Sequence, residues 1–132
     1  MIEVIRATPL TSGLALPTPT MPARTLNTNF TPHATRPTLC IYTVEIGGVT
    51  TLLSGDDGVI DLRSDTAATP TTVRCSHRLR IFQSLGVTVG TQVVDRGTLV
   101  YLVPAGHNVR LVSTTLVAAP TFALISSCEI TL

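Results

Sequence analysis

The stretch Leu39-Cys-Ile-Tyr-Thr-Val-Glu-Ile46 carries a period of two. In an extended chain successive side chains point to opposite faces, so every second residue lies on the same face. One face of this stretch holds Cys40, Tyr42, Val44 and Ile46, and the other holds Thr43 and Glu45. An apolar face opposite a more polar one predicts a β-strand that buries one side.

The same alternation recurs toward the C-terminus. Ile60 and Leu62 alternate with charged residues, and Val109 and Leu111 flank Arg110. At the end of the chain we expect one face to hold Phe122, Leu124, Ser126, Cys128, Ile130 and Leu132, with Glu129 and Thr131 on the other. Leu99–Val103 is apolar throughout, which predicts a strand buried on both sides.

Turn residues separate these segments. Ser54–Gly58 is rich in Gly and Asp, which tolerate positive φ angles, and it predicts a hairpin loop. Val103-Pro-Ala-Gly106 fits a type I turn with Pro second and Gly last. About eight short strands result, without a 3.6-residue apolar period. We therefore expect residues 38–132 to form one all-β domain, an antiparallel β-sandwich of jelly-roll type.

Residues 1–37 differ in composition, with six of the nine prolines and many threonines. Proline fixes φ and favours extended backbone before it, so this segment predicts an extended N-terminal arm, with a short strand only around Ile2 and Val4. A disordered tail is the alternative. We expect a neighbouring subunit to hold the arm through spaced anchors: Leu10, Leu14, Leu16, Met21, Leu26 and Phe30.

The bulk composition points to assembly. The chain has 132 residues, of which 44% are hydrophobic and 13% charged, and its mean hydropathy is +0.41. So few charges favour an apolar surface that meets a partner. All nine basic residues are Arg, a residue suited to interfaces. The net charge of +1 argues against non-specific binding of nucleic acid.

The ends and the cysteines suggest a compartment. No apolar run approaches the roughly 20 residues of a membrane-spanning helix, so no membrane contact is expected. Met1–Arg6 lacks the features of a secretory signal, so we expect synthesis in a reducing cytoplasm. Cys40, Cys75 and Cys128 lack C-x-x-C spacing and are interpreted as free thiols.

Catalytic and cofactor motifs are missing from the sequence. His33, His77 and His107 do not have the spacing of metal ligands, and no Gly-x-Ser-x-Gly elbow occurs. Asp56, Asp57, Asp61 and Asp65 offer oxygens to a calcium ion, but Asp-Asp-Gly is also an ordinary turn. We expect no enzyme activity, no metal and no cofactor.

One local basic cluster stands out, formed by Arg74, His77, Arg78 and Arg80. Arg side chains bind phosphate or carboxylate groups in a bidentate manner. Aromatic residues for base stacking are nearly absent near it, apart from Phe82. The cluster is therefore interpreted as a solvated strand edge or an interface patch on a protein subunit.

Several segments together resemble a group of small proteins encoded by tailed bacteriophages and prophages. They run from Leu26-Asn-Thr-Asn-Phe30 through Val59-x-Asp-Leu-Arg-Ser-Asp65 to Tyr101-Leu-Val-Pro-Ala-Gly-His-Asn-Val-Arg-Leu111. The likeness covers about residues 26–132, and Val-Pro-Ala-Gly-His-x-Val-Arg-Leu is its most distinctive part. The resemblance implies a viral source and the β fold, and it carries over no catalytic residue.

These observations predict a non-enzymatic virion structural protein, made in the host cytoplasm and located on the capsid surface. We expect a decoration (cement) protein that forms a homo-oligomer, with a trimer favoured, and contacts the major capsid protein or other virion subunits. The alternative is a tail-fibre or receptor-binding module that recognises the host surface through loops such as 47–58 or 84–97. Such sites usually need aromatic platforms, and the chain has no Trp and two Tyr.

Overall fold

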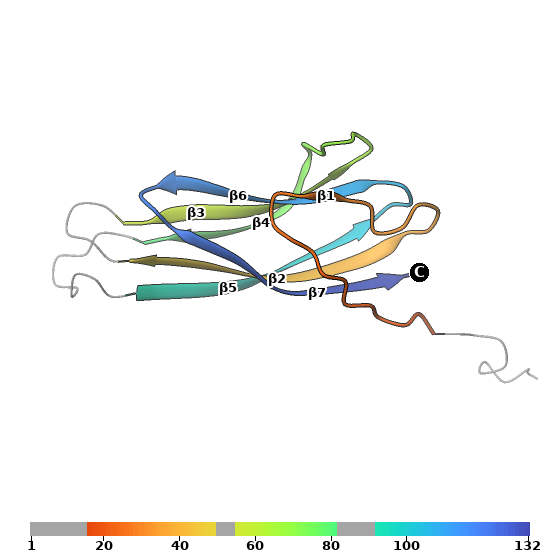
Figure 1. Cartoon of the computed structure of the whole chain (residues 1–132), viewed down its shortest axis with the longest axis horizontal. Helices are drawn as coiled ribbons and strands as arrows, with labels where there is room; N and C mark the ends of the chain where they lie inside the picture. The colour runs from red at the N-terminus through yellow and green to blue at the C-terminus, as the bar shows by residue number, and fades with distance from the viewer. Residues whose placement is uncertain (1–15, 50–54, 82–91) are drawn as a thin grey trace, which may run out of the picture.

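The computed structural model of the chain describes residues 16–49, 55–81 and 92–132 (Figure 1). These residues form no helix, and two antiparallel sheets pack face to face, so the predicted all-β sandwich is confirmed. The described ranges contain seven strands rather than about eight. They are β1 (Asn29–Phe30), β2 (Thr38–Val49), β3 (Asp57–Asp65), β4 (Val73–Arg80), β5 (Gln92–Val103), β6 (Asn108–Val117) and β7 (Thr121–Thr131).

The two sheets have the strand orders β5-β2-β7 and β1-β6-β3-β4. Among the described strands, β3 and β4 are the only consecutive pair in the same sheet. The steps from β2 to β3, β4 to β5, β5 to β6 and β6 to β7 each pass from one sheet to the other. β5 and β7 return to lie on either side of β2, which gives the domain a Greek-key, jelly-roll-like topology.

The core lies between the two sheets and follows the predicted alternation in β2. Cys40, Tyr42, Val44 and Ile46 are all fully buried. The facing sheet contributes Ile60 and Leu62 from β3 and Val109 and Leu111 from β6, also fully buried. Burial of each large apolar side chain stabilises the fold by about 1.5–3 kcal/mol before opposing terms.

The prediction that Leu99–Val103 is buried on both sides is wrong. Leu99 and Val103 point into the core, but Val100 is 52% exposed and Leu102 is 48% exposed. The reason is that the β5-β2-β7 sheet packs against the second sheet on one face only. Its outer face therefore carries apolar side chains that the described residues do not cover.

The predicted single face of the last strand is also wrong, because β7 contains a bulge. Ser126 pairs with Thr43 and Leu124 pairs with Val44, so Ile125 is an extra residue. A bulge shifts the alternation of one strand relative to its partner. Phe122 and Leu124 pack against the core, whereas beyond the bulge Ser127 and Glu129 are the buried residues.

The turn that joins β5 to β6 lies one residue later than the predicted Val103–Gly106, at residues 104–107, so Gly106 is its third residue and not its last. Gly106 has a φ of 74°, in the left-handed region that favours glycine, and the His107 amide donates to the Pro104 carbonyl. The predicted hairpin loop at 54–58 is wrong, because β3 already begins at Asp57 and lies in a different sheet from β2. Asp56 is buried there and accepts hydrogen bonds from the amides of Val49 and Ala119.

Candidate interaction surfaces

The segment from residue 16 to residue 31 closes one side of the sandwich. Thr20 and Glu129 exchange two backbone hydrogen bonds of 2.8 Å at the free edge of β7. The chain then crosses to the other sheet, where the Asn27 amide donates to the Leu111 carbonyl and Phe30 pairs with Val109 of β6. Figure 1 shows this orange segment running from β7 up to β1. The predicted boundary at residue 37 therefore does not separate the described arm from the β domain.

A buried ionic cluster fastens this segment. Arg24 donates from Nε and Nη2 to the two carboxylate oxygens of Glu129, both at 2.9 Å, and the Tyr42 hydroxyl donates to Glu129 Oε1 at 2.7 Å. The Arg24 guanidinium also lies 4.2 Å from the ring centroid of Phe30. The hydrogen bond to Glu129 raises the pKa of Arg24, and burial raises the pKa of Tyr42. The Glu129 side chain, only 4% exposed, is thus fully partnered inside the protein.

The structure divides the predicted arm anchors. Leu26 and Phe30 pack against the core of their own chain, so they are not available as anchors on a neighbour. Their role is intramolecular because the segment folds back over the open side of the sandwich. Leu16 and Met21 project outward, with exposed fractions of 83% and 77%. Leu10 and Leu14 lie outside the described residues.

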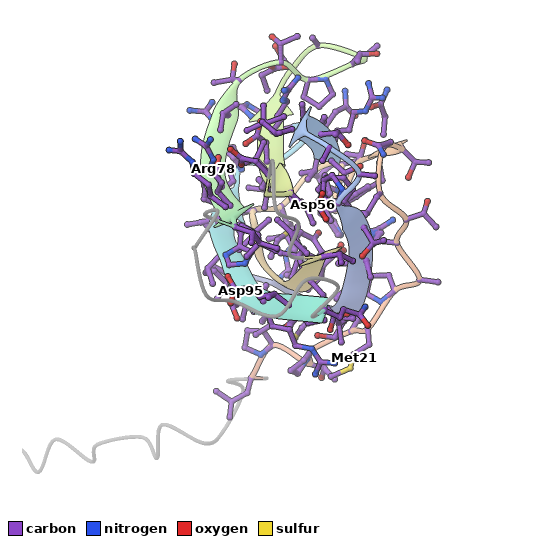
Figure 2. The ribbon with its side chains drawn as sticks, turned by 90° about the vertical axis from the view of Figure 1, so that its left-hand side faces the viewer. Met21, Asp56, Arg78 and Asp95 are labelled. Atoms are coloured by element: carbon purple, nitrogen blue, oxygen red, sulfur yellow. The ribbon has the colours of Figure 1, made fainter. Side chains whose placement is uncertain are left out.

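An open groove of about 310 Å³ lies between this segment and β7. It is lined by Met21–Arg24 on one side and by Leu124–Ser127, the residues around the bulge, on the other. Figure 2 shows Met21 at the lower rim of the molecule, away from the labelled Arg78. At the groove the segment contacts β7 through the Ser127 hydroxyl, which donates to the Pro22 carbonyl.

The predicted basic cluster separates into two environments. Arg78 binds the Asp57 carboxylate through two donors, one at 2.9 Å, and Arg80 Nε lies 3.9 Å from the same group. This pairing lowers the pKa of Asp57. Arg74 donates to the Ser64 carbonyl and lies 5.5 Å from the ring centroid of Tyr101. The three arginines thus sit on an outer surface with partners in their own chain.

His77 belongs to the seam between the two sheets. Its Nε2 lies 3.1 Å from the Asp95 carboxylate of β5. A Cβ added at Gly97 would approach within 2.2 Å of His77 Nδ1, so the imidazole fills the space that this glycine leaves. The Cys75 thiol also reaches the Val100 carbonyl across the seam, at 3.8 Å. His77 therefore joins β4 to β5 and does not enlarge the arginine surface.

The outer face of the β5-β2-β7 sheet carries a patch that we name the apolar face. Leu102, Leu39 and Ile130 stand opposite one another on the three strands, and Val100, Ile41 and Cys128 form the adjacent row. Directly opposed residues of antiparallel strands point to the same side of a sheet. All six side chains of these two rows are therefore apolar neighbours on one surface.

The apolar face is bordered by polar residues on one side. The next row consists of Thr98, Thr43 and Ser126, and beyond it Arg96 donates to Glu45 at 2.6 Å. The outer face of the opposite sheet is charged: its registered pairs include Asp57 with Arg80 and Arg63 with Arg110. The molecule thus presents one apolar and one charged sheet surface. Sequence reasoning missed the apolar face, although the apolar run at 99–103 was its signal.

The aspartates considered for calcium do not converge. Asp57 pairs with Arg78, while Asp65 accepts hydrogen bonds from the amides of Ala67, Thr71 and Thr72. The backbone bonds from Thr71 and Thr72 lower the pKa of Asp65 to about 2. Across residues 16–49, 55–81 and 92–132, no group of three or more His, Cys, Asp or Glu side chains is placed to bind a metal.

Comparisons with known proteins add no functional assignment. No protein-family model matches the chain, and no curated protein matches it significantly. Within the described residues, no helix is long and apolar enough to cross a membrane. The surfaces of the domain are therefore the guide to its function.

Proposed function

We propose that this protein is a non-enzymatic structural protein of a bacteriophage virion that decorates the capsid surface. The observation that carries the proposal is the apolar face, where Val100 and Leu102 stay about half exposed beside four further apolar side chains. A contiguous exposed apolar surface is typical of a protein–protein contact. The likeness of residues 26–132 to small phage proteins is the reason to seek the partner in a virion.

The N-terminal segment supports the same role. Leu16 is exposed, and Pro17 and Pro19 keep the chain extended where it leaves the domain. The 15 residues before Leu16 can reach about 50 Å when extended. An arm of this length touches a neighbouring subunit of an assembly, such as the major capsid protein or another copy in a homo-oligomer. Many weak contacts of this kind combine into strong attachment.

The test is binding of the purified protein to capsids that lack it. We expect the full chain to bind in many copies per capsid, and a chain of residues 16–132 to bind at least tenfold more weakly. The deletion stops at residue 15 because residues 20–30 hold the sandwich closed. Val117→Asp is the matched control, since Val117 is an exposed apolar residue on β6, outside the apolar face.

Two outcomes contradict the proposal. Only a few copies per virion would indicate a tail component. Binding to host cells that survives deletion of residues 1–15 would indicate the alternative, a receptor-binding module.

A further inference from the structure

We infer that the apolar face of one copy binds the N-terminal segment, residues 1–16, of a neighbouring copy. This inference rests on the proposed role in assembly and deepens it, because it names both surfaces of the contact between copies. The occupant is therefore a second copy of this chain rather than a foreign protein.

The direction in which the chain leaves the domain favours a neighbour. Thr20 pairs with Glu129 in the antiparallel sense, so the chain traced back toward Leu16 runs toward the C-terminal end of β7. Pro17 and Pro19 resist a reversal of this extended backbone. In Figure 1 the described segment continues past the C-terminus, away from the body of the sandwich. The segment is thus aimed outward from its own apolar face.

The two surfaces match in chemistry and number. Residues 1–15 contribute the apolar residues Ile2, Val4, Ile5, Leu10 and Leu14, with only one acidic and one basic residue. The apolar face offers six apolar side chains in two rows across three strands. Covering them removes apolar area from water, which is the main favourable term in association. Extended backbone suits a shallow sheet surface of this kind.

Every copy carries one segment and one face, which makes the contact head-to-tail. Such heterologous contacts close into rings when the rotation between copies permits. The inference therefore gives the expected homo-oligomer a physical basis. A reach of about 50 Å is several times the separation of about 10 Å between the outer strands of a three-stranded sheet.

The first test uses Cys128, which lies on the apolar face, as a reporter. Leu14→Cys or Ile5→Cys is introduced singly into a Cys75→Ser background, and the protein is oxidised with diamide. We expect intermolecular disulfides between the new cysteine and Cys128, seen as ladders on a non-reducing gel and identified by mass spectrometry. Adding Cys128→Ser should abolish the ladders. Intrachain disulfides as the main product, or ladders that persist without Cys128, would overturn the inference.

The second test measures oligomeric state by light scattering. The full chain should be oligomeric, while residues 16–132 and full-length Val100→Asp should be monomeric with an unchanged melting temperature. Val117→Asp should remain oligomeric. If residues 16–132 stay oligomeric and Val100→Asp does not, two apolar faces pair directly and the inference is wrong. A monomeric full chain would contradict it too.

These results separate the inference from the proposed function. If the cross-links are lost but capsid binding is retained, only the proposed exchange of segments between copies is wrong. If the cross-links form but the protein does not bind capsids, the exchange between copies stands and the proposed capsid role is wrong.

Discussion

At the scale of single residues, Glu129 holds the N-terminal segment against β7 and β2. Its carboxylate is buried and receives three charged or polar donors from Arg24 and Tyr42. A buried ion pair contributes little net stability, but removal of one partner leaves a charge without compensation. The pair therefore fixes where residues 20–24 lie more than it adds to total stability.

Replacement of Arg24 by Ala should lower the free energy of unfolding by about 3 kcal/mol, because Glu129 then keeps only the Tyr42 hydroxyl. Glu129→Gln is the matched control and should cost about 1–2 kcal/mol, since Arg24 is 20% exposed and can reach water. Urea unfolding measures both. A smaller loss for Arg24→Ala than for Glu129→Gln would contradict this account.

Asp65 should make stability depend on acid pH. Its pKa is about 2 in the folded protein and about 3.9 in an unfolded chain, so the folded state favours the ionised form. The contribution of Asp65 to the free energy of unfolding is complete above pH about 4 and is lost as pH falls through about 2. Unfolding of Asp65→Asn, compared with the parent between pH 2 and 5, should show a shallower decline. Parallel curves would show that Asp65 does not contribute.

At the scale of the element, β7 shows how one extra residue changes which side chains of a strand face the core. Before the bulge Phe122 and Leu124 face the core, and after it Cys128 and Ile130 face outward onto the apolar face. Without the bulge Glu129 would lie outside and could not meet Arg24. The bulge thus creates the ionic cluster and two of the six residues of the apolar face.

Deletion of Ile125 should be tolerated, because this residue has no partner on β2 and is 44% exposed. Leu124 and Ser126 would become consecutive and keep their partners, Val44 and Thr43. Deletion of Cys128 is the control and should unfold the protein, since it turns Glu129 to the opposite face. Circular dichroism and thermal melting distinguish them. Equal loss of structure in the two deletions would refute this assignment of the bulge.

At the scale of the whole molecule, the sandwich depends on a segment that is remote in sequence from its final strand. Residues 20–30 bridge β7 and β6 and place Leu26 and Phe30 over the core. The six strands β2–β7 alone would leave that side open. Residues 20–30 are therefore part of the fold, whereas the chain before Thr20 leads away from it.

Two truncations should separate the roles of these two parts. Removal of residues 1–15 should leave the melting temperature of the domain within a few degrees of the parent value, apart from any effect of oligomer loss. Removal of residues 1–31 should expose the core, with strong binding of a hydrophobic dye and aggregation, because Arg24, Leu26 and Phe30 are lost. A soluble, cooperatively folded chain of residues 32–132 would contradict this role.

The inner faces of β2, β3 and β6 and the Gly106 turn could be predicted from the sequence alone. Each depends on a few consecutive residues: period two places Tyr42 or Leu62 inside, and a turn before β6 needs a positive φ that suits glycine. These are local properties of the backbone, so neighbouring residues contain the information.

The remaining features follow from contacts between segments that are distant in the sequence. The bulge at Ile125, the exposure of Val100 and the own-chain packing of Phe30 depend on which strand or segment lies alongside. Arg24 and Glu129 are 105 residues apart in the chain, and no local pattern joins them. Because alternation is a local property, it was enough to predict β2, β3 and β6 with their inner faces. Which outer face the described residues leave uncovered depends on long-range packing, which no local pattern contains.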